Sequence, residues 1–379
     1  MKRTPLFMTH QRLGARLIEF GGWEMPVQYT SIVDEHLTVR KAAGLFDISH
    51  MGEFLVSGPG AESFLNGALT NDIRKLSPGL GQYTLCCNES GGVIDDLYAY
   101  RLSAEDYLLI VNASRIGIDF EWIEKQLGRS PHKGRVQLRN ASDEMGAVAV
   151  QGPRVAEFIN DCFPGDSTAG TKVSKASELQ KNQIGQFNFQ GKPVWVSRTG
   201  YTGEDGFEVV APAESIIAVW DTIQQRGKLS GLKPAGLGAR DTLRTEVCYP
   251  LYGHELDEET TPIEAGVGFF VALDKGEFTG REKLAQQKAE GVEKKLVAFR
   301  MADKCAPPRP HYPLWSAANE SARIGEVVSG TQSPSLGVGI GMGYVPPEFG
   351  KVQTVLNVEI RGQRATAVVV PKPIYRKAG

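Results

Sequence analysis

Hydrophobic and polar positions along the first half of the chain alternate between two periods. Apolar residues at helical spacing predict four helices, at residues 9–20, 30–43, 59–69 and 115–127. Between the last two, residues 83–87, 93–101 and 107–112 have the extended pattern and are separated by turns, which predicts a β-meander. Residues 44–56 indicate a strand, a sharp turn and a second strand. Strands joined by hairpins rather than by helical crossovers indicate an α+β fold with antiparallel sheets.

The pattern changes after a charged connection at residues 290–295. Five extended segments follow, separated by Gly and Pro turns, which predicts a small β-barrel or sandwich; they are 295–301, 324–329, 337–344, 355–360 and 365–370. We therefore expect one region at residues 1–290 and a second at 291–379. The run GVGIGMG at 337–343 lacks a following helix, so it indicates a strand packed closely through glycine and not a nucleotide-binding loop.

Composition excludes several classes of protein. The 379 residues carry a net charge of -2, which gives no electrostatic reason to bind nucleic acid or an anionic membrane. No apolar run is long enough to span a bilayer, and the first residues do not form a signal peptide. The five cysteines fit neither a disulfide framework nor a zinc site, and they favour a cytoplasmic location.

The segment GYTGEDGFE at 200–208 concentrates glycines and carboxylates between two predicted strands. A hairpin tip of this kind is able to aim Glu204 at a ligand, but turn chemistry alone also favours these residues. By itself the segment is more typical of a solvated turn, in which Asp205 and Glu208 are ordinary turn and strand residues.

Two adjacent carboxylates interrupt an apolar strand in the segment GGVIDDL at 91–97. Because side chains alternate along a strand, Asp95 and Asp96 must face opposite sides, and only one of them is able to enter a given pocket. A carboxylate in a pocket would stabilise a cation or exchange a proton with it. The alternative is that both residues cap the preceding turn or pair with Arg101.

Two arginines one helical turn apart lie in GARDTLR at 238–244, so Arg240 and Arg244 would grip a ligand carboxylate or ring heteroatom together. An ion-paired surface helix is the alternative. The polar loop LYGHELDEETTP at 251–262 lacks metal-ligand spacing, and we expect no metal site. The sequence also lacks a G-x-S-x-G elbow, a Walker loop and a dinucleotide fingerprint after a strand.

Six motifs in one order along the chain resemble those of the glycine cleavage aminomethyltransferases, the T-protein family. They are DISHMGE at 47–53, GGVIDDL, GYTGEDGFE, GARDTLR, LYGHELDEETTP and KPIYR at 372–376. The resemblance implies an α+β cloverleaf of three subdomains around a central folate-binding hole, the last of them a small β-barrel. It also implies transfer of an aminomethyl group from the lipoyl arm of the H-protein to tetrahydrofolate, a co-substrate, with release of ammonia and no metal.

The resemblance assigns site residues by position. Asp96 corresponds to the aspartate near the reactive folate nitrogens and is the expected catalytic residue. The expected folate-binding residues are Met51, Tyr83, Asn112, Glu204, Arg240, Tyr375 and Arg376. Glu204 would accept hydrogen bonds from the pterin ring, and Asp96 would stabilise a cationic intermediate and handle the N10 proton. The expected partners are the lipoylated H-protein and other glycine cleavage components, with neither nucleic acid nor membrane among them.

Related families leave two alternatives. A folate-dependent demethylase of a small methylated substrate is the nearest enzymatic one. The non-enzymatic iron-sulfur assembly factors carry a cysteine in a K-G-C-Y-x-G-Q-E motif, whereas residues 275–282 read KGEFTGRE here. Oxidases built on the same scaffold add an N-terminal G-x-G-x-x-G, which this sequence lacks.

Overall fold

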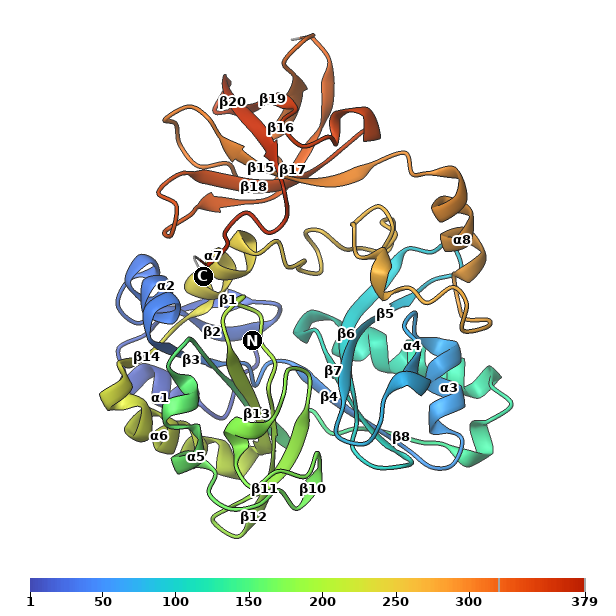
Figure 1. Cartoon of the computed structure of the whole chain (residues 1–379), viewed down its shortest axis with the longest axis vertical. Coiled ribbons are helices and arrows are strands. Elements are labelled where there is room, and N and C mark those ends of the chain that lie inside the picture. Colours follow the sequence, from blue (N-terminus) through green and yellow to red (C-terminus); the bar gives the residue numbers. More distant parts are fainter. Residues whose placement is uncertain (320, 378–379) are drawn as a thin grey trace. The chain divides into compact units, whose positions relative to one another are not determined.

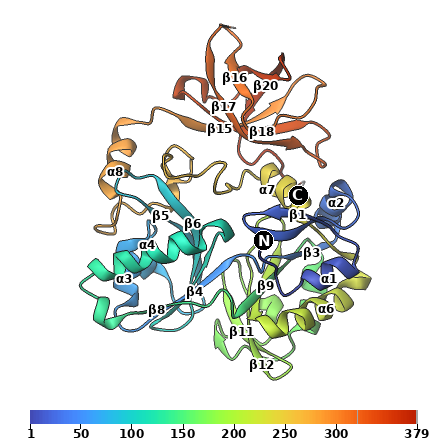
Figure 2. The ribbon, with the colours of Figure 1, turned by 180° about the vertical axis from the view of Figure 1, so that it is seen from behind.

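The amphipathic segments between residues 43 and 234 form two sheets with helices packed on them. The computed structural model describes residues 1–319 and 321–377 (Figures 1 and 2). Two units divide the chain. Unit 1 comprises Met1–Cys86, Asp95–Arg240 and Lys275–Phe278, and unit 2 comprises Cys87–Ile94, Asp241–Asp274 and Thr279–Gly379. Both units are discontinuous in sequence, and the boundary we expect after residue 290 stays a prediction.

The predicted meander forms the centre of a five-stranded sheet. Its order is β5 (Gly81–Cys87), β6 (Val93–Arg101), β7 (Asp106–Val111), β4 (Gly52–Ser57) and β8 (Gln137–Asn140). The helices that follow β4 and β7 are α3 (Ala61–Ala68) and α4 (Ile116–Arg129). Phe54 of β4 meets Phe120 of α4 edge to face at 5.3 Å between ring centroids, so α4 covers the Phe54 face of this sheet.

A seven-stranded sheet forms the other half of unit 1. Its order is β10 (Ala169–Gly170), β11 (Ile184–Phe189), β12 (Lys192–Ser197), β13 (Gly206–Pro212), β9 (Met145–Gln151), β3 (Ala43–Asp47) and β14 (Leu232–Pro234). Only the β14–β3 pair is parallel among the pairings given for this sheet. The accompanying helices are α1 (Phe7–Arg12), α2 (Ile32–Lys41), α5 (Ile159–Cys162) and α6 (Ile216–Gly227). Trp220 of α6 is fully buried in the core beneath the sheet.

The helix predicted at residues 9–20 is wrong over its second half. Helix α1 ends at Arg12, and Gly14 takes a left-handed φ of +71° that a helix cannot continue. Residues 16–20 instead form β1 (Arg16–Phe20), which pairs antiparallel with β2 (Trp23–Gln28). The residues of this segment thus form a short strand. In so short a segment, the spacing of apolar residues alone does not distinguish a helix from a strand.

Unit 2 contains the end of α7 (Leu237–Glu246), the helix α8 (Arg281–Glu290) and a closed barrel. The barrel order is β15 (Lys295–Met301), β18 (Gly339–Val345), β17 (Arg323–Gln332), β16 (Pro313–Ser316), β19 (Val355–Ile360) and β20 (Gln363–Val370). The α+β class and the C-terminal barrel are confirmed. The short strand β16 was absent from the sequence prediction, since only four residues, headed by a proline, signal it.

The glycine-rich run at 337–343 contributes β18, as predicted. A Cβ at Gly341 would lie 2.5 Å from the Phe299 ring, and one at Gly343 would lie 2.6 Å from the Glu326 carbonyl oxygen. Glycine at these positions therefore permits the close packing of the barrel wall. Within the described part of the chain, all five cysteines are free thiols, and no helix is both long and apolar enough to cross a membrane.

Candidate functional site

Register within the five-stranded sheet separates the two adjacent aspartates. Tyr98 pairs with Ile110, and Ile110 pairs with Glu53, so these three side chains share one face. Asp96 precedes Tyr98 by two residues and lies on the same face, whereas Asp95 points to the face that α4 covers. Accordingly Asp95 is fully buried, while Asp96 is only partly buried. The structure places Asp95 and Asp96 on opposite faces, as the alternation predicted, with Asp96 on the face that α4 does not cover.

Two neighbours hold the Asp96 carboxylate in place. The Tyr83 hydroxyl donates to Asp96 Oδ2 at 2.8 Å, and Asn112 Nδ2 donates to Asp96 Oδ1 at 2.9 Å. Burial, followed by the nearby Asp95 charge, raises the pKa of Asp96 to about 7. A carboxyl poised near neutrality is suited to accept or return a proton. Turn capping is excluded for this residue, and Arg101 pairs instead with Glu62 at 2.7 Å.

The turn between β3 and β4 presents Met51. Asp47, at the end of β3, accepts a hydrogen bond from the Ser49 amide at 2.8 Å, and the Met51 amide donates to the Ile48 carbonyl at 3.0 Å. Asp47 is itself fixed by His10 Nε2 at 2.8 Å and by the Thr4 hydroxyl at 2.6 Å. The buried network thus sets the shape of the DISHMGE segment and directs Met51 into a cavity.

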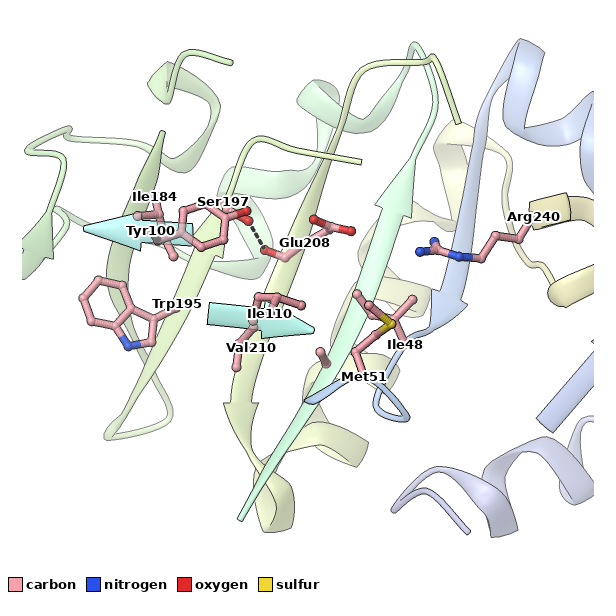
Figure 3. Close-up of a pocket in the computed structure, with 11 residues that line it drawn as sticks. Ile48, Met51, Tyr100, Ile110, Ile184, Trp195, Ser197, Glu208, Val210 and Arg240 are labelled. Carbon is pink, nitrogen blue, oxygen red and sulfur yellow. Dashed lines mark hydrogen bonds between the residues drawn. The ribbon is translucent and has the colours of Figure 1, made fainter. Parts of the chain in front are cut away.

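That cavity lies between the two sheets of unit 1 (Figure 3). Its wall from the five-stranded sheet includes Tyr100 and Ile110, on the same face as Asp96. The seven-stranded sheet contributes cross-strand rows of paired residues. The lining residues are Ile48, Met51, Tyr100, Ile110, Ala147, Ile184, Trp195, Ser197, Glu208, Val210 and Arg240.

Glu208 and Arg240 are the charged groups of this lining. Figure 3 shows Arg240 extending toward the strand that carries Glu208. The Arg240 guanidinium lies 4.8 Å from the centre of the Tyr201 ring, and its Nη1 is buried without a hydrogen-bond partner among the described residues. Burial lowers the pKa of Arg240, while Glu208 opposes that effect. A buried donor without a partner, beside a carboxylate, is suited to a polar ligand.

Glu208 is a site residue that sequence reasoning missed. We expected it to be an ordinary strand residue, but Ser197 pairs with it across β12 and β13, and Ile184 pairs with Ser197. All three line the cavity. The Thr199 hydroxyl donates to Glu208 Oε2 at 2.6 Å. Alternation along 206–210 set Glu208 opposite the buried Phe207 and Val209, and that signal was available in the sequence.

Glu204 occupies a different environment from the one expected. It forms an ion pair with Arg40 Nη1 at 3.1 Å, and the two side chains are only 3% and 4% exposed. The same Arg40 nitrogen donates to the Thr202 carbonyl at 2.7 Å, and Glu204 is not among the residues that line the cavity. Asp205 pairs with Arg198 at 2.6 Å and is a turn residue, as expected. A folate-binding role for Glu204 stays a prediction.

The remaining predicted residues, Arg244, Tyr375 and Arg376, belong to unit 2. Arg244 pairs there with Glu255 at 2.8 Å and donates to the Ser329 hydroxyl at 2.8 Å, so a joint grip with Arg240 is wrong. The Tyr375 amide donates to the Glu246 carbonyl at 2.9 Å. Contact of Tyr375 and Arg376 with a ligand stays a prediction.

In the polar loop at 251–262, His254 forms a hydrogen bond within the protein. His254 Nδ1 lies 2.9 Å from the Val328 carbonyl oxygen, an acceptor, so this nitrogen carries the proton. Across residues 1–319 and 321–377, no group of three or more His, Cys, Asp or Glu side chains is arranged to hold a metal ion.

Comparison with known proteins shows which family the chain belongs to. Residues 6–275 match the family model described as the GCVT N-terminal domain, and residues 294–376 match the glycine cleavage T-protein C-terminal barrel domain. The chain therefore belongs to the glycine cleavage T-protein family. As a member of this family it is an aminomethyltransferase, a one-carbon transferase.

Relatives within the T-protein family match the chain over its whole length. An aminomethyltransferase from Geobacillus sp. (strain WCH70) is 45% identical, with all of both chains covered. One from Desulfitobacterium hafniense is 42% identical over all of this chain and 99% of its own. The crystal structure of glycine cleavage system aminomethyltransferase T from Bartonella henselae superposes with a TM-score of 0.88 at 33% identity, covering 99% of this chain and 98% of that one.

Proposed function

We propose that this T-protein transfers the methylene of the aminomethyl group on the lipoyl arm of an H-protein to tetrahydrofolate. The products are 5,10-methylenetetrahydrofolate, ammonia and the dihydrolipoyl carrier. The observation that supports this most directly is the Asp96 carboxyl, held by Tyr83 and Asn112 on a sheet face that also lines the cavity. Tetrahydrofolate is a co-substrate in this proposal, and no metal takes part.

The reaction forms two C–N bonds, from the methylene to N5 and to N10, and breaks the C–N bond to ammonia and the C–S bond to the lipoyl sulfur. Ammonia and the sulfur leave with the electron pairs of those bonds, and each takes up one proton: one is lost by N5, and the other is passed on from N10 by Asp96. Positive charge develops beside Asp96, whose carboxylate stabilises it and then accepts the proton that N10 loses. The cavity walls keep water from the methylene, because hydrolysis would release formaldehyde.

Binding of the pterin ring would use the polar part of the cavity. Arg240 offers a buried donor, and Glu208 offers a carboxylate oxygen that is suited to accept ring N–H groups. Met51 supplies an apolar wall, and Tyr83 and Asn112 act by holding Asp96. Tyr375 and Arg376 remain proposed contacts on the strength of the family resemblance alone. So does Glu204, but its charge is already matched by Arg40, so it contributes less to folate affinity than Glu208.

The proposal also covers partners and location. The lipoylated H-protein would dock to present its arm, with other glycine cleavage components nearby, and the reaction would take place in the cytoplasm. Free thiols at all five cysteines are compatible with a reducing compartment.

The test is ammonia release by the purified chain. We expect ammonia only when tetrahydrofolate and the aminomethylated lipoyl carrier are both present. Asp96→Asn should lower turnover by about 10²- to 10⁴-fold, since it removes the proton acceptor, and should leave tetrahydrofolate affinity within a few-fold. Asp106→Asn, an exposed carboxylate on neighbouring β7, is the matched control and should keep full turnover.

Other results would remove the proposal. Wild-type turnover by Asp96→Asn would end the assignment of Asp96. Folate binding without any ammonia release from the carrier would favour an assembly factor. Methyl transfer from a small methylated compound in place of the carrier would favour a demethylase.

A further inference from the structure

A second pair of carboxyl groups lies behind Asp96, on the helix-covered face of the five-stranded sheet. Asp95 of β6 and Asp119 of α4 are both 0% exposed. Their carboxyl groups are within hydrogen-bonding reach of each other. Two buried anions in contact would each lose their hydration and repel each other, so this arrangement requires a proton between them.

The Asp119 oxygens receive no hydrogen bond in the described residues. Both Oδ1 and Oδ2 are buried without a donor, although Asp119 lies in the first turn of α4, where free backbone N–H groups often hold carboxylates. Two carboxylate oxygens are both acceptors and cannot bond to each other. If Asp119 carries the proton, its hydroxyl becomes a donor to Asp95, and the absence of other donors is explained.

Asp95, in contrast, is surrounded by donors. The Asn112 amide N–H donates to Asp95 Oδ2 at 3.0 Å, and Asn112 Nδ2 donates to Asp95 Oδ1 at 2.8 Å. Hydrogen bonds from N–H groups favour the ionised form of the acceptor, so the proton of the pair belongs on Asp119. Burial and the Asp95 charge raise the pKa of Asp119, while Arg115 lowers it and Asp96 raises it further.

The side-chain amide of Asn112 joins this pair to the proposed catalytic carboxyl of Asp96. Nδ2 donates to Asp95 Oδ1 at 2.8 Å and to Asp96 Oδ1 at 2.9 Å, and the Tyr83 hydroxyl binds the other Asp96 oxygen. We propose that Asp119 is a neutral acid that donates its proton to Asp95, and that it thereby fixes Asn112 and the position of Asp96. Asp119 is a positioning residue in this scheme, which rests on the proposed role of Asp96.

The proton on Asp119 also sets the charge around the site. With it, Asp95 and Asp119 together carry a single negative charge. Without it, two anions beside Asp96 would keep Asp96 protonated at neutral pH and prevent it from accepting the N10 proton. The groups that face the pair are Arg115 on the same side and, beyond Asn112, Asp96 with Tyr83.

The first experiment locates the proton without measuring activity. Infrared spectra of the full chain at neutral pH are compared for wild type and Asp119→Asn. We expect the difference spectrum to contain the carbonyl stretch of a protonated carboxyl, shifted in heavy water. Glu124→Gln, an exposed carboxylate on the same helix, is the matched control and should lose carboxylate bands only. If the difference spectrum of Asp119→Asn contains only carboxylate bands and no protonated-carboxyl band, the proposal is overturned.

The second experiment tests positioning. Asp119→Asn keeps a donor toward Asp95, so we expect kcat within about threefold of wild type and an unchanged acidic limb of the pH profile. Asp119→Ala removes the donor; we expect kcat to fall by about tenfold or more with KM for tetrahydrofolate nearly unchanged. Equal kcat in both variants would overturn the positioning role. If Asp96→Asn proves fully active, the proposed function fails, while the infrared result still decides where the proton lies.

Discussion

At the scale of single residues, the environment of each carboxyl decides what it is able to do. Asp95 and Asp96 are adjacent, yet one accepts two hydrogen bonds from Asn112 in the interior, and the other lies on the sheet face that lines the cavity and has a pKa of about 7. Glu204 and Glu208 differ in the same way, since the first neutralises Arg40 and the second lines the cavity. A carboxylate whose charge is already matched by an arginine has little left to offer a ligand.

This contrast predicts the effects of two identical substitutions within one motif. Glu208→Gln should raise KM for tetrahydrofolate by about tenfold or more, because a hydrogen bond to a charged group is worth about 1.5–3 kcal/mol. Glu204→Gln should lower stability, since it leaves Arg40 without its buried counter-charge, and should keep KM near the wild-type value. Steady-state kinetics and thermal unfolding of both variants check this. A raised KM for Glu204→Gln with an unaffected Glu208→Gln would restore Glu204 as the pterin ligand.

At the scale of elements, the length of a strand decides whether its sequence pattern is recognisable. Close backbone contacts decide which of its residues tolerate a larger side chain. The meander β5 to β7 and the barrel strands were predicted because each has a clear extended pattern between turns. The strands β1, within the segment 9–20, and β16 were not predicted, because short elements contain too few residues to display a period. In the barrel the glycine run itself predicted a closely packed strand. The structure adds the distances that a Cβ at these glycines would have to Phe299 and Glu326.

A methyl group added at Gly341 tests this packing. The new Cβ would meet the Phe299 ring at 2.5 Å and the Ser329 carbonyl oxygen at 2.8 Å, and the second contact is with backbone that cannot move aside. Gly341→Ala should therefore destabilise the chain by about 1–3 kcal/mol in urea unfolding. Gly128→Ala on α4, where a Cβ meets nothing within 4 Å, should gain up to about 1 kcal/mol. Equal stabilities for the two variants would contradict the close-packing explanation.

At the scale of the whole molecule, the stability of the chain includes a cost for polar groups buried near the site. Glu53 shares the cavity face of the five-stranded sheet with Ile110, is 1% exposed, and has no hydrogen-bond partner for either carboxylate oxygen in the described residues. Burial raises its pKa well above the usual value. Its folded-state pKa exceeds its unfolded-state pKa, so the native chain binds more protons, and stability is lost as pH rises through that interval.

The substitution Glu53→Met removes this dependence while keeping side-chain length. The gain in unfolding free energy over wild type should be smallest at pH 5 and larger at pH 8, growing by at most about 1.4 kcal/mol per pH unit. Urea unfolding at several pH values measures it. Glu121→Met, at an exposed position of α4, is the control and should show a difference that does not change with pH. A Glu53→Met gain that is flat in pH would mean that Glu53 is ionised in the folded chain.

The sequence by itself determined the classes of element, the C-terminal barrel, the family, and the placement of Asp95 and Asp96 on opposite faces of a strand. These follow from local periodicity and from motifs in a fixed order, which a linear pattern records. Only the tertiary structure decided that Glu208 lines the cavity while Glu204 pairs with Arg40, and that Asp119 meets Asp95 behind the site. Residues 40 and 204, or 95 and 119, lie apart in the chain, and the charge balance of a buried group depends on which partners the fold brings within a few ångströms.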